Sequence, residues 1–363
     1  MTDPLWQRTG TELVALMASV DVSAREVIEA HLERIDEVNG WLNAAVLVAA
    51  DEARAAADAT DRARAAGETL GPLAGVPFTV KDGLDLAGHP TTYGIPAFAG
   101  NVAPVDDPTI GRLRSAGAIP IAKTNQPEMA MRLATDNPLF GLTRNPWHPD
   151  RTASGSSGGD ASAIASGMTP MGVGSDLGGS VRNPAYACGI AATKTSLGRL
   201  PVHGTSPRAS EALLGRQLMA VAGPMARSVA DLEAMLRVTV GRHPRDPRSV
   251  DVPHDGSSFV RRAAVPTDLP GGPIHPDARE AVRRAGEALA ADGWEVVDAT
   301  PPEMERCYDV WGRLLGEDFP MTMEALSAVI SDDGAHLIRS SMVFWPAGEV
   351  APQEVHIERH RLA

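Results

Sequence analysis

The sequence predicts an α/β fold in which helices cover both faces of a β-sheet. Helix-like and strand-like segments alternate along the chain, and this alternation is typical of sheets whose faces are covered. Of the 363 residues, 43% are hydrophobic and 22% are charged, which is an ordinary globular balance. Large α/β enzymes reach this length on one sheet, so we expect a single domain over residues 1–363.

Two helices are expected first. Ser23 and Glu26 have the spacing of a capping box, and Gly40 supplies a stop, so we expect a helix over residues 23–40. The apolar face of this helix repeats at helical spacing through Val27, Ile28, His31, Leu32 and Ile35. The alanine-rich residues 49–67 form the second expected helix, which ends at Gly67.

Strand and helix patterns then alternate. Residues 73–82 are short, apolar and β-branched, and they predict a strand that enters a loop. Residues 107–125 predict a helix, a turn and a strand. Residues 160–166 are small and apolar nearly all round, which predicts a helix buried on every side, and residues 168–176 predict the buried strand that follows.

The remaining segments continue the same pattern. Ser228 and Asp231 predict another capping box, at the start of a helix within residues 228–241. Residues 275–299 predict a helix followed by a strand, whereas the Pro- and Gly-rich residues 241–275 predict a surface excursion and not a domain linker.

Charge and composition exclude several classes of protein. The net charge of −13 disfavours nucleic acid as a partner. No stretch of about 18 apolar residues predicts a membrane span, and the first residues lack the features of a secretory signal. Two cysteines, Cys188 and Cys307, are too few for a disulfide framework, and no paired Cys or His pattern predicts a metal site. We therefore expect a cytoplasmic protein without metal or cofactor, with a homodimer as an open alternative.

Three places in the chain have residues suited to catalysis. Lys81 follows an apolar strand, and burial would lower its pKa and allow it to act as a base, although an isolated lysine is usually a surface residue. Residues 154–159 are rich in Ser and Gly; such tracts are usually flexible linkers, but this one is short and adjoins the buried helix. Ser180 follows Gly178 and Gly179, whose backbone N–H groups could hold a developing oxyanion. A glycine turn before a helix would explain these two glycines equally well.

A serine nucleophile needs a base, and two kinds of base are open. His148 and His203 lie near the loops in question, but neither has a partner pattern and no G-x-S-x-G elbow is present. A lysine that reaches the nucleophile through an intermediate serine is physically sound, because a hydroxyl both donates and accepts a hydrogen bond. A Ser-His-Asp hydrolase is therefore the weaker of the two interpretations.

An ordered series of segments resembles the amidase signature family of serine hydrolases. The segments are GVPFTVKD, AKTNQPEMA, GLTRNPWHPDRT, SGSSGGDASAIASG, GSDLGGSVRNPA, TSLGRLP and GPMARSVADLEAML, within residues 12–236. The resemblance implies a large mixed, twisted β-sheet covered by helices on both faces. It also implies hydrolysis of a small-molecule carboxylic acid amide to the acid and ammonia or an amine, without a cofactor.

The resemblance assigns roles to particular residues. Ser180 corresponds to the acylated nucleophile, Ser156 to a bridging serine that follows a cis peptide bond from Gly155, and Lys81 to the base. The implied oxyanion hole is formed by the backbone N–H groups of Leu177, Gly178, Gly179 and Ser180, and Asp176 and Arg182 would brace that loop.

The sequence also departs from the family pattern. Ser154 replaces the usual first glycine of the signature, and Asp160 stands where a serine or another small residue is common. Asp160 would raise the pKa of the lysine if it pointed inward, but we expect it to cap free N–H groups at the start of its helix. Family members continue beyond the position of Ala363, so we expect this chain to lack a C-terminal segment and to be less soluble or less active than a longer form.

Two alternative functions stay open. One branch of the family is the amidase subunit of the glutamine-dependent tRNA amidotransferase. Residues 216–221, RQLMAV, differ from the Ser-Leu-Asp-Gln run of that branch, which speaks against this alternative. An inactive amide-binding homologue is the other alternative, and the presence of Lys81, Ser156 and Ser180 together argues for catalysis.

Overall fold

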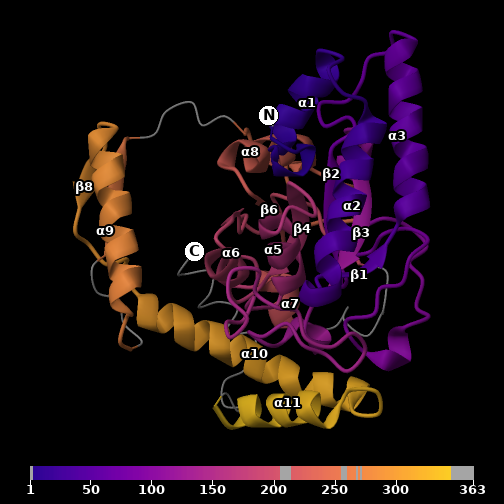
Figure 1. Cartoon of the computed structure of the whole chain (residues 1–363). Coiled ribbons are helices and arrows are strands. Elements are labelled where there is room, and N and C mark those ends of the chain that lie inside the picture. Colours follow the sequence, from indigo (N-terminus) through magenta and orange to yellow (C-terminus); the bar gives the residue numbers. More distant parts are fainter. Residues whose placement is uncertain (1–2, 205–213, 255–259, 267–268, 270–271, 345–363) are drawn as a thin grey trace. The chain divides into compact units, whose positions relative to one another are not determined.

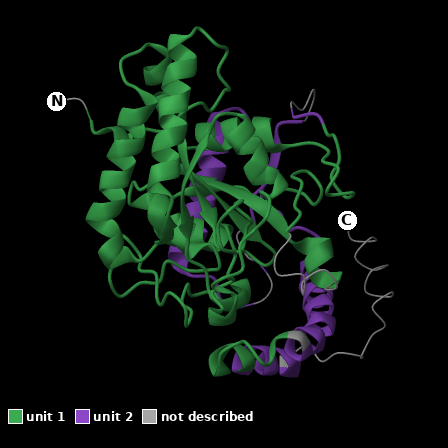
Figure 2. Cartoon of the chain, turned by 90° about the vertical axis from the view of Figure 1, so that its right-hand side faces the viewer, with its two compact units in different colours: residues 1–252, 325–335 green, residues 253–324, 336–363 purple. Residues whose placement is uncertain are grey.

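The computed structural model describes every residue except 1–2, 205–213, 255–259, 267–268, 270–271 and 345–363. The chain divides into two compact units, residues 1–252 with 325–335 and residues 253–324 with 336–363 (Figure 2). The boundary between residues 252 and 253 falls inside the stretch that the sequence analysis interpreted as a surface excursion. The single domain over residues 1–363 stays a prediction, and each unit is described by itself.

A six-stranded mixed sheet lies at the centre of the first unit, in the order β1-β3-β2-β4-β6-β5 (Figure 1). Strand β2 runs parallel to β3 and to β4, whereas β1, β6 and β5 pair with their neighbours in the antiparallel sense. This sheet confirms the predicted α/β fold class with mixed strand directions. The strands are β1 (Ala45–Val48), β2 (Pro77–Lys81), β3 (Ile119–Thr124), β4 (Met171–Asp176), β5 (Ala191–Ala192) and β6 (Val221–Ala226).

Helices connect and cover these strands. They are α1 (Gly10–Ala18), α2 (Ala24–Leu42), α3 (Ala50–Ala65), α4 (Pro108–Ser115), α5 (Gly158–Ala165), α6 (Arg182–Cys188), α7 (Leu214–Met219) and α8 (Val229–Thr239), with short 3-10 helices at Leu5–Gln7, Pro96–Phe98 and Glu128–Ala130. The small-residue helix α5 is buried from Gly158 through Ile164, as its composition predicts.

The two faces of β2 show why both sides of the sheet need cover. Successive side chains of a strand point to opposite faces. Phe78 and Val80 belong to the main core cluster together with Val27 and Ile28 of α2. On the other face, the Thr79 hydroxyl donates to Asp160 of α5. Strand β2 is therefore buried on both faces, and all five of its residues are inaccessible.

The N-terminal helices follow the predicted caps but not every predicted end. Ser23 and Glu26 form both hydrogen bonds of the capping box, which confirms the start of α2. The helix continues past Gly40 to Leu42 and ends at Asn43, which adopts the left-handed conformation at φ 52°. The side-chain oxygen of Asn39 accepts from the N–H groups of Ala44 and Ala45, so these side chains and not the glycine end the helix.

The capping box predicted for α8 is only half correct. Ser228 caps the N–H of Asp231, as expected. The Asp231 carboxylate, however, accepts from the N–H groups of Gly10 and Thr11 at 2.9 and 2.8 Å. The residue caps the start of α1, about 220 positions away in sequence, instead of its own helix.

The second unit holds a smaller βαβ arrangement. Strand β7 (Arg262–Ala264) pairs in parallel with β8 (Glu295–Val297), and α9 (Pro276–Ala291) connects them. This confirms the helix and strand predicted within residues 275–299. Helices α10 (Met304–Leu326) and α11 (Asp332–Phe344) follow and contribute residues to both units. Over the whole described part of the chain, no helix has the length and apolar character needed to cross a membrane.

Candidate active site

A buried lysine amine surrounded by serine hydroxyls is the centre of the candidate site. Lys81 is the last residue of β2 and has no exposed surface. Its Nζ lies 2.7 Å from Ser156 Oγ, 3.0 Å from Ser157 Oγ and 3.0 Å from Ser175 Oγ. Three hydroxyl groups from two separate segments therefore contact one amine.

Parallel pairing of β2 and β4 brings Ser175 to the lysine. The register pairs Val80 with Val173, so both strands end at the same edge of the sheet. Lys81 is the last residue of β2, and Ser175 is the next-to-last residue of β4. The site therefore lies at the carboxyl ends of two central parallel strands, where α/β sheets commonly bind ligands.

The Ser/Gly-rich loop places the other two hydroxyls. The peptide bond between Gly155 and Ser156 is cis, as the family resemblance implies. A Cβ atom on Gly155 would lie 2.4 Å from the carbonyl oxygen of Arg132, so no larger residue fits there. The Ser157 N–H donates to the carbonyl oxygen of Ser180 at 3.0 Å. This bond joins the loop that holds Ser156 to the turn that holds Ser180.

Ser180 lies in a tight turn between β4 and α6. Asp176 organises this turn, because its carboxylate accepts from the N–H groups of Gly179 and Val181 at 2.8 and 3.1 Å. The Arg182 guanidinium donates to both oxygens of the same carboxylate, at 3.0 and 2.9 Å. Burial raises the pKa of Asp176, but the hydrogen bonds from Arg182 and the backbone outweigh burial and leave the pKa below its usual value. Asp176 is therefore held ionised.

The geometry of the turn differs from the expected oxyanion hole at one position. Gly179 has φ 114°, a conformation that favours glycine. Its N–H donates to Asp176, so in this structure it is not free to bind an oxyanion. Leu177, Gly178 and Ser180 remain as candidate donors. Ser180 Oγ makes no hydrogen bond to any residue that the structure describes.

Burial dominates the electrostatics of Lys81. It lowers the pKa of the amine from its ordinary value, because a buried ammonium loses its hydration. Asp160, Asp176 and Asp82 oppose this shift, and Arg216 adds to it. The net direction is downward, so the neutral amine is more accessible here than in a surface lysine.

Asp160 does not make the contact that the sequence suggested. We expected its side chain to cap N–H groups of its own helix. Instead, Asp160 Oδ1 accepts from the Thr79 hydroxyl of β2 at 2.9 Å. The carboxyl is fully buried between α5 and the sheet.

The structure also shows which residues the sequence analysis missed and which it set aside correctly. Ser157 and Ser175 contact Lys81 although neither was singled out; their only signal was that each adjoins a selected residue. The histidines of the alternative interpretation lie elsewhere: His148 Nδ1 accepts from Asp150 N–H, and the His203 N–H donates to Asp107. Among described residues, neither histidine bonds to a serine of the site.

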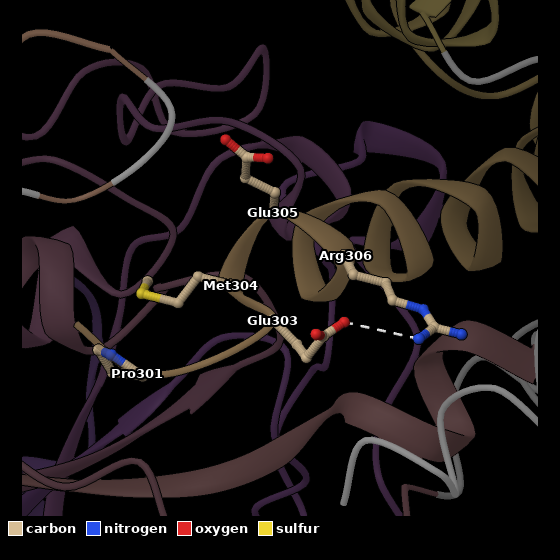
Figure 3. Close-up of a pocket in the computed structure, with 5 residues that line it drawn as sticks. All are labelled: Pro301, Glu303, Met304, Glu305 and Arg306. Carbon is tan, nitrogen blue, oxygen red and sulfur yellow. Dashed lines mark ion pairs between the residues drawn. The ribbon is translucent and has the colours of Figure 1, made fainter.

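A pocket in the second unit has a different character (Figure 3). Pro301, Glu303, Met304, Glu305 and Arg306 line it, and Glu303 pairs with Arg306 at 3.5 Å. In Figure 3 the Glu305 carboxylate points away from this ion pair. The lining contains no hydroxyl or thiol nucleophile, so it offers no acyl-transfer chemistry. Across the described ranges, no three His, Cys, Asp or Glu side chains come together as a metal site.

Comparison with known proteins decides the family. A family model described as Amidase matches residues 26–361. The chain belongs to the amidase signature family. It is 39% identical over 338 residues to a Bradyrhizobium diazoefficiens protein named indoleacetamide hydrolase, covering 92% of this chain and 64% of that protein. It is also 39% identical over 309 residues to the glutamyl-tRNA(Gln) amidotransferase amidase-type subunit of Acidothermus cellulolyticus, covering 83% of this chain and 60% of that protein.

Solved structures of this amidase family share the fold. A structure of 6-aminohexanoate cyclic dimer hydrolase with its substrate has a TM-score of 0.83 and 27% identity, covering 99% of this chain and 76% of that one. The chain thus spans less than two thirds of the length of the two curated relatives and about three quarters of this structural relative.

Proposed function

We propose that this amidase-family chain hydrolyses a carboxylic acid amide through an acyl-serine intermediate. The observation that carries the proposal is the 2.7 Å contact between the buried Lys81 amine and the Ser156 hydroxyl. Serine is a weak nucleophile without a base, and a lysine with a lowered pKa supplies one. In this proposal Ser180 is the nucleophile, Ser156 is the bridge and Lys81 is the base.

The hydroxyls around Lys81 suit a neutral amine. An ammonium has three donors, whereas a neutral amine has two donors and one lone pair. The neutral amine can donate to Ser157 and Ser175 and accept the Ser156 proton at the shortest of the three contacts. Its lone pair is then directed at Ser156, which is the orientation that a base in this relay needs.

The reaction proceeds in two balanced steps. Ser156 takes the Ser180 proton as it passes its own proton to Lys81, and Ser180 Oγ attacks the amide carbonyl. The Lys81 ammonium returns the proton through Ser156 to the leaving nitrogen, which departs as ammonia or an amine. Water then attacks the acyl-serine, and the same relay restores Ser180. The N–H groups of Leu177, Gly178 and Ser180 are the proposed donors to the oxyanion.

For the substrate we propose a primary amide with an apolar acyl group. Its support is the similarity to the protein named indoleacetamide hydrolase, so indole-3-acetamide is the first compound to test. We also keep the sequence-based proposals of a cytoplasmic protein that needs no cofactor, with a homodimer as an open alternative.

Ammonia release with hydroxylamine capture tests the proposal. An acyl-enzyme partitions between water and hydroxylamine, so we expect both the acid and the hydroxamate, with ammonia released at the summed rate. Direct attack of water on the amide would give acid without hydroxamate and would contradict the mechanism. The absence of ammonia with every amide in a panel of aryl, alkyl and amino-acid amides would contradict the function.

A component of a transferase complex is the second candidate, and it is favoured by the similarity to the glutamyl-tRNA(Gln) amidotransferase protein of Acidothermus cellulolyticus. The RQLMAV segment includes the end of α7 and speaks against it, since the family branch has a Ser-Leu-Asp-Gln run there. Glutamine as the preferred ammonia donor in the same assay would support this second candidate over the first.

A further inference from the structure

Asp160 is a buried carboxyl that the proposed mechanism leaves without a role. It lies in the first turn of α5 and has no exposed surface. Its Oδ1 accepts from Thr79 at 2.9 Å, while its buried Oδ2 has no hydrogen-bond partner in the described structure. A buried carboxyl with one unsatisfied oxygen is costly to the fold, so its position calls for an explanation.

Two independent contacts place Asp160 in the same buried layer as the Lys81 amine. Thr79, which donates to Asp160, and Lys81 are two residues apart on β2 and therefore share a face of the strand. Ser157, which contacts Lys81 Nζ, lies three residues before Asp160 at the start of the same helix. The strand and the helix thus both carry the lysine and the carboxyl side by side.

Tight packing keeps the carboxyl in this layer. A Cβ atom on Gly172 of β4 would lie 3.0 Å from Asp160 Oδ1 and 2.2 Å from Thr79 Oγ1. No side chain therefore fits between β4 and the Thr79–Asp160 pair. With no exposed surface, the carboxyl cannot exchange its contacts for water without a local opening of α5.

The charges on the two groups are linked. Burial raises the pKa of Asp160 and lowers the pKa of Lys81, and each group opposes the shift of the other. The remaining charged groups that act on Lys81 are Asp176 and Asp82, which favour the ammonium, and Arg216, which disfavours it. Asp176 is already neutralised by Arg182, so Asp160 is the carboxyl best placed to respond to the lysine charge.

We propose that Asp160 is a positioning residue that offsets the positive charge formed on Lys81 during acyl transfer and titrates with it as a pair. The lysine gains a proton when Ser180 attacks, which creates an ammonium in a buried site. The ionised carboxylate of Asp160 lowers the free energy of that ammonium through space. Asp160 itself donates and accepts no proton in the relay. This inference rests on the proposed function, since it assumes that Lys81 is the base.

The proposal predicts two linked effects of Asp160→Asn. Loss of the negative charge lowers the pKa of Lys81, so the acid limb of the kcat/KM profile moves to lower pH. The weaker base also lowers kcat on the plateau, by about tenfold for each pKa unit lost if proton transfer is fully rate-limiting. Thr79→Val removes the hydrogen bond that favours the ionised carboxyl, so it moves the limb in the same direction by a smaller amount.

The pH profile separates this role from a structural one. A structural role lowers kcat or thermal stability and leaves the acid limb where it was. Asp160→Ser supplies a second charge-removing variant if Asp160→Asn does not fold. An unmoved acid limb in the folded variants overturns the proposal.

A spectroscopic titration tests the pair without any turnover. The infrared carbonyl band of protonated Asp160, assigned by its loss in Asp160→Asn, reports the proton on this carboxyl. Removing the lysine charge with Lys81→Met raises the pKa of Asp160, so the band persists to higher pH than in the wild type. An identical titration in both proteins overturns the linkage. A shifted band in a chain without amidase activity would contradict the proposed function but retain the pair.

Discussion

Two buried lysines on adjacent strands show how partners decide what a residue can do. Lys123 of β3 donates to the carbonyl oxygens of Asp82 and Pro90 and to the Thr91 hydroxyl. Carbonyl oxygens only accept hydrogen bonds, so they favour the ammonium form. Lys81 is surrounded by hydroxyls, which can donate as well as accept. Only the second environment accommodates a neutral amine with its lone pair in use.

The pH dependence of activity follows from the neutral form of Lys81. Burial lowers the pKa of the amine, so activity is lost as pH falls through that lowered pKa and rises as pH increases. Lys81→Ala should lose about 10²- to 10⁴-fold in kcat, the usual contribution of a general base. Lys81→Arg should not restore activity, because a guanidinium stays protonated. Steady-state kinetics from about pH 6 to about pH 9 would contradict the base role if kcat/KM fell over that range.

The strand β4 supports the site through residues that have no side chain. A Cβ atom on Gly174 would lie 2.5 Å from Ser157 Oγ and 2.8 Å from Ser157 Cβ. Because Ser157 contacts Lys81 and also bonds to the Ser180 turn, a displaced Ser157 would move both. The element therefore positions the relay from behind.

Gly174→Ala tests this support. We expect a loss of about 10²-fold in kcat/KM, the scale that follows displacement of catalytic groups by about 1 Å. The matched control is Gly40→Ala, because Gly40 lies in α2 with no atom within 4 Å of an added Cβ. The control should keep wild-type turnover. Equal kinetics in both variants would show that Gly174 does not position the site.

A second prediction at this scale concerns how α1 is attached to α8. Asp231 is fully buried and accepts both N–H groups at the start of α1. Asp231→Ala leaves these two donors without a partner, so unfolding in urea should show a loss of about 1–3 kcal/mol in stability. Asp231→Asn keeps one acceptor oxygen and should lose less. An unchanged midpoint in Asp231→Ala would contradict the assigned cap.

At the scale of the whole molecule, local sequence rules predict the elements better than the contacts between them. The end of β2 at Lys81, the buried helix α5 and the Ser23 cap of α2 all follow from short patterns. The contacts of Lys81 with Ser157 and Ser175 depend on strand register and on the path of a loop, which no local pattern encodes. The same holds for Asp231, whose partner helix lies at the other end of the first unit's sequence.

Strand β6 shows a local rule overruled by topology. Pro224 lies inside it, and proline in a central strand normally argues against that assignment. The neighbouring strand β5 is only two residues long and pairs with Met225 and Ala226. The Pro224 carbonyl accepts from Thr193 on the β5 side, beyond that short ladder. The missing N–H of the proline is therefore tolerated next to a strand too short to require it.

The overall charge gives a prediction that bears on the choice between the two candidate functions. With a net charge of −13, the chain should repel the phosphate backbone of tRNA. We expect no retention of labelled tRNA by the isolated chain in a filter-binding assay at physiological salt. Salt-sensitive binding in the micromolar range would contradict this expectation and strengthen the transferase candidate.

Covalent labelling of Ser180 tests the central claim most directly. A fluorophosphonate reacts with an activated serine, and intact-mass and peptide analysis identifies the labelled residue. We predict one adduct, on Ser180, in the wild-type chain, no adduct in Ser180→Ala, and a labelling rate reduced by about 10²-fold or more in Lys81→Ala. Loss of turnover in Ser180→Ala should reach about 10³-fold or more. An adduct that persists in Ser180→Ala, or that maps to another serine, would contradict the relay from Lys81 through Ser156 to Ser180.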